Sequence, residues 1–101
     1  MEMYQRLMAA LPSDASVRLA CIDIVLVVMV LTGQRKSAVT IQELNEQFPN
    51  RDCAKLVSTA INCGLLQPAV DSGVGVRLGK LALDIIRDDN GRKDQRVSGN
   101  H

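Results

Sequence analysis

The feature that most constrains this chain is an apolar run near its N-terminus, from Leu19 to Leu31, which reads LACIDIVLVVMVL. A membrane-spanning helix needs about 20 apolar residues. This run is shorter, follows Arg18 and contains Asp23. A secretory signal peptide is not expected either, because the run starts late and Glu2 spoils the positively charged beginning of such a peptide. The run therefore predicts a core helix that is apolar almost all round.

A helix of this kind has to be covered on most of its sides, and a chain of 101 residues has room for one small core. A second subunit is one way to cover it, so we expect a homodimer. Asp23 interrupts the run, and a buried carboxylate is costly unless it is paired. We expect Asp23 to be structural rather than catalytic, paired with Arg18 or a capping backbone group, or placed at the dimer interface.

Local signals divide the N-terminal half into helices. Apolar side chains at helical spacing predict a first helix over residues 2–11. The long helix should be capped by Ser13 or Ser16 and run to about Leu31, because Gly33 soon afterwards is typical of a helix end.

The clearest local signal is a capping box formed by Thr40 and Glu43. It predicts a short helix over residues 41–48. Asn50 then predicts the cap of a further helix over residues 51–63.

After Gly64 the pattern of apolar residues changes. Residues 65–68 and 74–78 are expected to be two strands of a hairpin, because apolar and other residues alternate in the second segment. A last amphipathic helix is predicted over residues 80–87. The polar residues 88–101 should form a disordered tail, which leaves one domain over residues 1–87.

Composition narrows the function classes. Twelve Lys and Arg against eleven Asp and Glu give a net charge of +1, so overall charge favours neither nucleic acid nor an acidic partner. One Tyr, one Phe and no Trp argue against stacking on single-stranded nucleic acid. Cys21, Cys53 and Cys63 are too far apart for a zinc site or a disulfide framework. We expect buried free thiols in a reducing cytoplasm, with a redox-sensing thiol as the alternative, and no metal or cofactor.

Enzymatic chemistry has little support. The chain has no G-x-S-x-G elbow and no phosphate-binding G-x-x-x-x-G-K loop, and its one histidine is the last residue, His101. The glycines of SGVGVRLG indicate a turn rather than a dinucleotide site, because no parallel-strand unit precedes them. Asp88 and Asp89 fall in the expected tail. We therefore predict that the protein is not an enzyme.

The order of predicted elements is that of a winged helix-turn-helix, a mainly α fold with a small β-hairpin. TIQELNEQF resembles the first motif helix of small bacterial winged-helix transcription regulators, AKLVSTAINCGLL resembles their recognition helix, and SGVGVRL resembles their glycine-rich wing. The pattern is most similar to the iron–sulfur cluster repressor family over Thr40 to Leu78. Cluster-bearing members place three cysteines beyond the wing, whereas no cysteine follows Cys63 here. An iron–sulfur cluster is therefore not expected.

The resemblance implies a cytoplasmic transcription regulator of bacterial or phage type that binds duplex DNA through the third helix and the wing. Helical spacing also points Asp52 outward, where it would repel phosphate. The tail cations Arg92, Lys93 and Arg96 are further candidates for phosphate contacts. The main candidate contacts to bases or phosphates are Arg51, Lys55, Ser58, Thr59, Asn62, Arg77, Arg35 and Lys36.

A second function stays open. Winged helices also serve as protein-interaction modules, and fold alone does not decide between the two uses. The alternative is an adaptor or inhibitor that binds another protein through the same surfaces or through the long apolar helix.

Overall fold

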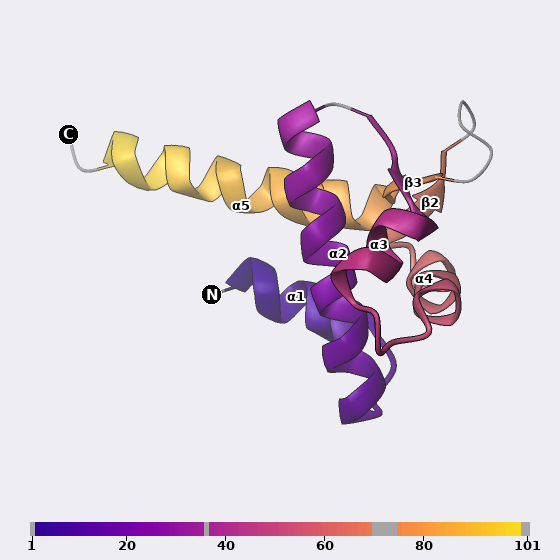
Figure 1. The fold of residues 1–101 in the computed structure, drawn as a ribbon. Helices are drawn as coiled ribbons and strands as arrows, with labels where there is room; N and C mark the ends of the chain where they lie inside the picture. The colour runs from indigo at the N-terminus through magenta and orange to yellow at the C-terminus, as the bar shows by residue number, and fades with distance from the viewer. Residues whose placement is uncertain (1, 36, 70–74, 100–101) are drawn as a thin grey trace.

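The apolar run lies within a long helix, around which the other elements of a mainly helical fold are arranged (Figure 1). The computed structural model describes residues 2–35, 37–69 and 75–99, with side chains over 3–35, 37–69 and 75–89. The elements in these ranges are, in chain order, α1 (Glu2–Ala10), α2 (Ala15–Arg35), β1 (Val39–Thr40), α3 (Ile41–Gln47), α4 (Cys53–Asn62), β2 (Leu66–Pro68), β3 (Gly75–Leu78) and α5 (Lys80–Gly99).

Helix α2 begins and ends at other residues than predicted. Its first turn is capped by Asp14, whose Oδ1 accepts hydrogen bonds from the amides of Ser16 and Val17, so the predicted Ser13 or Ser16 cap is wrong. The helix also continues past Gly33 to Arg35. Nothing lies within 4 Å of a Cβ built at Gly33, and an exposed glycine inside a helix weakens it without ending it.

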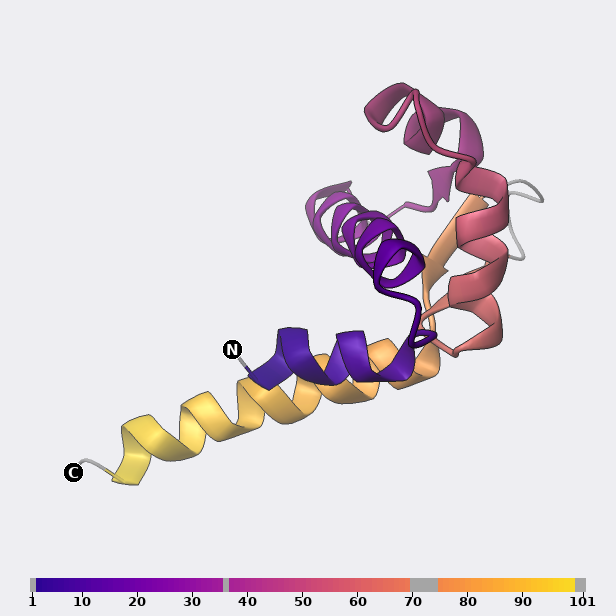
Figure 2. The same cartoon turned by 90° about the horizontal axis from the view of Figure 1, so that it is seen from below.

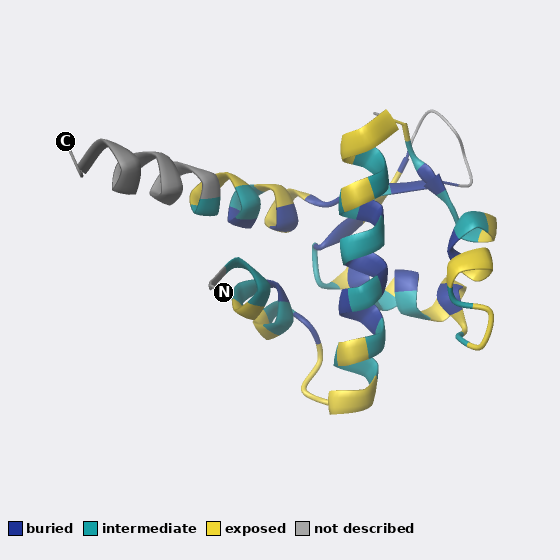
Figure 3. Ribbon diagram, turned by 60° about the vertical axis from the view of Figure 1, so that its left-hand side comes forward, coloured by how far each residue is buried: buried dark blue, intermediate teal, exposed yellow. Residues whose placement is uncertain are grey.

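One face of α2 forms the centre of the core. Helix α2 packs against α4 and β3, and buried segments gather around it (Figure 3). The buried residues of α2 are Cys21, Ile22, Ile24, Val25 and Val28.

Helices α3 and α4 begin at acceptor side chains. The capping box is confirmed: the Glu43 amide donates to Thr40 Oγ1, and the Glu43 carboxylate accepts from the Thr40 amide, both at 3.1 Å. The predicted Asn50 cap is wrong, because Asp52 Oδ1 accepts from the Lys55 amide at 3.2 Å and α4 starts at Cys53. Residues 48–52 join the two helices.

The predicted hairpin is confirmed and belongs to a larger sheet. Strands β2 and β3 pair antiparallel, with Leu66 opposite Leu78, and β1 pairs on the other side of β3. The strand order is β1-β3-β2, so Pro68 lies on an edge strand, as expected. Strand β1 was not predicted, because two residues are too few to show a strand pattern.

Helices α1 and α5 lie side by side and run away from the body of the protein (Figure 2). Arg6 of α1 and Asp88 of α5 form a salt bridge at 3.0 Å. The predicted end of the last helix at Arg87 is wrong, since α5 continues to Gly99 through most of the expected disordered tail. The segment contains no proline, so its backbone hydrogen bonds can continue in spite of its polar composition.

Two glycines join the end of α4 to the start of α5. Gly64 has a φ of 84°, a left-handed conformation that ends α4 as predicted. Its carbonyl accepts from the Leu81 amide, and the Gly79 amide donates to the Leu65 carbonyl. A Cβ at Gly79 would lie 2.9 Å from the Leu66 carbonyl oxygen. The backbone at Gly79 and the backbone at residues 64–66 therefore approach too closely for a side chain at this position.

Candidate functional site

The exposed face of α4 carries three of the eight main predicted contact residues. Cys53, Val57 and Ala60 are buried on the inner face of this helix. Lys55, Ser58 and Asn62 are exposed, at spacings of three and four residues that place them on one outer face. The structure therefore brings these three predicted residues together; we call them the α4 face.

Thr59 and Asp52, beside the α4 face, form hydrogen bonds with the backbone of α4. Thr59 is half-buried, and its hydroxyl donates to the Lys55 carbonyl at 3.1 Å. Asp52 is exposed, and its carboxylate caps the helix. That cap places a negative charge at the positive end of the helix dipole, which is favourable. It also places the charge one turn from Lys55.

Arg51 lies before α4 and is held against α2. Its guanidinium pairs with the Asp23 carboxylate at 3.0 Å and lies over the Phe48 ring, 4.7 Å from the centroid. The expected Arg18 partner of Asp23 is therefore wrong, because Arg18 donates to the carbonyls of Leu11 and Pro12. Asp23 is also not buried, since 47% of its side chain is exposed. Arg51 joins α2 to the α3–α4 connection.

Arg35 is engaged in the same way at the start of α3. Its guanidinium makes two hydrogen bonds to the Glu43 carboxylate, at 2.5 and 2.7 Å, and one to the Ala38 carbonyl. The hydrogen bonds from Arg35 and from the Thr40 amide lower the pKa of Glu43 from 4.5 to about 2. Arg35 thus stabilises the capping box. The capping box already placed Glu43 at the third position of the helix, but no local pattern identified Arg35 as its partner.

The remaining predicted cations are spread over the chain. Arg77 is half-buried on the central strand β3, opposite Gln67. Lys36 lies outside the described residues, and the side chains of Arg92, Lys93 and Arg96 lie outside the described part as well.

The three cysteines are free thiols, and the burial predicted for all three is confirmed for two of them. Cys21 and Cys53 are buried, and Cys63 is half-buried. Burial raises the pKa of the Cys21 and Cys53 thiols, which disfavours the reactive thiolate. Over the side chains that the structure describes, no three His, Cys, Asp or Glu residues are grouped to hold a metal ion.

This chain was compared with protein-family models, with curated proteins and with solved structures. None of them matches.

Proposed function

We propose that this protein is a DNA-binding transcriptional regulator with a winged helix-turn-helix. Helix α4 would enter the major groove and the β2–β3 hairpin would act as the wing. The observation that carries the proposal is the α4 face, with one cation and two hydrogen-bonding side chains opposite a fully packed inner face. Its setting supports it, because α4 follows α3 after a short turn and is followed by an antiparallel hairpin.

Each side chain of the α4 face has a partner type on duplex DNA. The Lys55 ammonium suits a phosphate or the two acceptors of a guanine edge, and the Asn62 amide suits adenine. The Ser58 hydroxyl suits either bases or the backbone. A protein that covers a promoter in this way blocks transcription without a cofactor, and it would act in the cytoplasm.

One observation favours protein binding as a second candidate. Arg35 and Arg51 are engaged in ion pairs within the chain, which leaves Lys55 as the cation of the α4 face. Phosphate neutralisation usually supplies much of the affinity for DNA. A largely neutral α4 face therefore also suits an adaptor that binds another protein.

The test is the affinity for a mixed pool of short duplexes, measured by fluorescence anisotropy at about 50 and 200 mM salt. We expect Lys55→Glu to weaken binding by about tenfold or more, because a single good base or phosphate contact contributes about 1–3 kcal/mol. The variant should stay folded, since a glutamate at this position, three residues after the Asp52 cap, completes a capping-box pattern.

Lys80→Glu is the matched control, because it makes the same charge change at an exposed lysine on α5. It should change the affinity much less than Lys55→Glu does. Equal effects of the two variants would show that the α4 face is not the DNA-binding surface. No binding by the unsubstituted protein at about 50 mM salt would favour the adaptor.

A further inference from the structure

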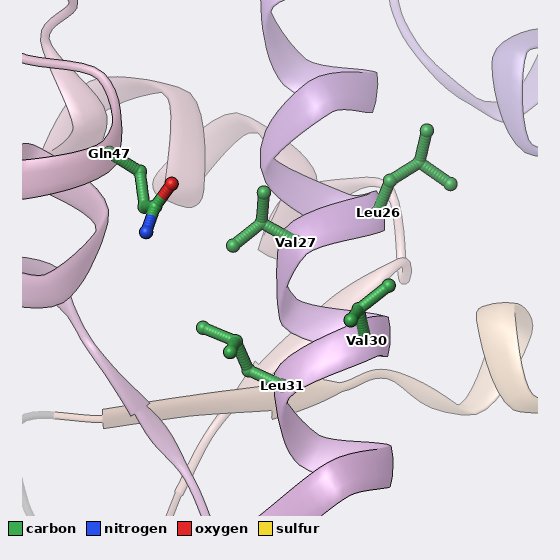
Figure 4. Close-up of a pocket in the computed structure, with 5 residues that line it drawn as sticks. All are labelled: Leu26, Val27, Val30, Leu31 and Gln47. Carbon is green, nitrogen blue, oxygen red and sulfur yellow. The ribbon is translucent and has the colours of Figure 1, made fainter.

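Helix α2 has an apolar face that the rest of the chain leaves uncovered. Leu19 and Val30 are 54% and 50% exposed, although large apolar side chains are usually buried. Figure 4 shows how Leu26, Val27, Val30 and Leu31 spread over successive turns of α2, with Gln47 of α3 at one side. These residues line a shallow pocket of about 280 Å³. We call Leu19, Leu26, Val27, Val30 and Leu31 the α2 face.

A lipid bilayer is a poor occupant for the α2 face. By length and composition α2 is able to cross a membrane, with a mean hydropathy of 2.2 over an 18-residue window. Its opposite side, however, forms the centre of the core and packs against α4 and β3. Membrane insertion would require that core to come apart. The occupant therefore has to bind α2 from one side while the fold stays intact.

The one charge within the α2 face is neutralised inside the chain. Asp23 lies between Leu19 and Leu26 at helical spacing, and its carboxylate pairs with Arg51 at 3.0 Å. A partner that covers this face does not have to supply a counter-charge. A face that is apolar and electrically neutral is complementary to a second copy of itself, because nothing on it repels the same face.

The chain is more open than a compact monomer of its mass. The protein exposes 6394 Å², whereas a folded monomer of 11.0 kDa is expected to expose about 5,600 Å². The radius of gyration of 14.3 Å also exceeds the value of about 13 Å for a compact chain of this length. The α1–α5 pair projects from the body of the protein and contributes to this open shape (Figure 2).

We propose that a second copy of this chain packs on the α2 face, so that the protein is a two-fold symmetric homodimer with α2 at its interface. This inference does not depend on DNA binding. It deepens the sequence-based expectation of a dimer, because it names the surface that the second copy covers.

The test is the molecular mass in solution, measured by sedimentation equilibrium at about 50 μM, above the micromolar dissociation constants at the weak end of standard protein interfaces. The unsubstituted protein should have twice the mass of 11.0 kDa. Val30→Lys and Leu19→Lys should have the mass of one chain, since each would place an unpaired charge inside the interface. Both positions are half exposed, so both variants should stay folded. The thermal midpoints of the two monomeric variants should lie within a few degrees of each other.

Asn45→Lys, at an exposed position of α3, is the matched control and should remain a dimer. A monomeric unsubstituted protein would overturn the proposal. A dimer that survives both α2 substitutions would show that another surface holds the copies together. Co-sedimentation of the protein with vesicles of zwitterionic phosphatidylcholine, lost in Val30→Lys, would identify lipid as the occupant of the α2 face and would also overturn the proposal.

Discussion

At the scale of single residues, Gly79 and Gly33 show that glycine is required at one position and weakens the fold at another. A Cβ at Gly79 would press on the carbonyls of Gly64 and Leu66, whereas a Cβ at Gly33 would meet nothing within 4 Å. We expect Gly79→Ala to lower the free energy of unfolding by about 1–3 kcal/mol, the usual cost of overpacking. Gly33→Ala should raise it by about 0.5–1 kcal/mol, because alanine is the better helix former.

Urea unfolding followed by circular dichroism measures both effects. The two variants carry the same chemical change. Changes of opposite sign in the free energy of unfolding would therefore be caused by the different surroundings of the two glycines. A Gly79→Ala protein as stable as the original would show that the turns around Gly64 and Gly79 are not closely packed.

At the scale of one element, the start of α3 should respond to acid. Glu43 has its pKa lowered to about 2, first by the hydrogen bond from Arg35 and then by that from the Thr40 amide. Because this carboxyl binds its proton more weakly in the folded state, its contribution to stability is complete above about pH 4.5 and is lost as the pH falls towards 2. Glu43→Gln removes the charge, so its stability should fall less between pH 5 and pH 3 than that of the original protein.

The comparison uses urea midpoints of the two proteins across that pH range. Glu46→Gln is the control, since Glu46 is an exposed acid of the same helix and has no ion pair in the part of the chain that the structure describes. Its midpoints should run parallel to those of the original protein. Parallel curves for Glu43→Gln as well would mean that the Arg35–Glu43 pair does not stabilise α3 in solution.

At the scale of the whole molecule, the two proposed surfaces lie on different helices and should be separable. A dimer doubles the DNA contacts that one weakly basic chain can make, and two-fold symmetric regulators read two half-sites. Val30→Lys should therefore lose the dimer and also weaken duplex binding. Lys55→Glu should weaken duplex binding and remain a dimer. Measuring mass and anisotropy on the same samples checks this, and a monomeric Val30→Lys with full DNA affinity would show that one chain suffices.

The candidate site was predicted in part. Lys55, Ser58 and Asn62 lie together on the exposed face of α4, as helical spacing indicated. Arg51 was grouped with them because the predicted helix began at residue 51, whereas α4 begins at Cys53. Arg35 was added as a cation in the loop before the capped helix. The structure pairs Arg51 with Asp23 and Arg35 with Glu43. The sequence alone does not distinguish a solvent-exposed cation from one held in an ion pair, because the fold decides which acidic residue lies beside it.

By itself the sequence determined the features that depend on neighbours within a few residues. The Thr40–Glu43 box, the end of α4 at Gly64 and the edge strand containing Pro68 follow from hydrogen bonds or backbone preferences of single short segments. The tertiary structure decided what depends on distant residues. Asp23 meets Arg51 from 28 residues away, and Val39 becomes a strand residue because Val76 lies beside it. No local pattern encodes such pairs, because each forms only once the helices and strands have packed together.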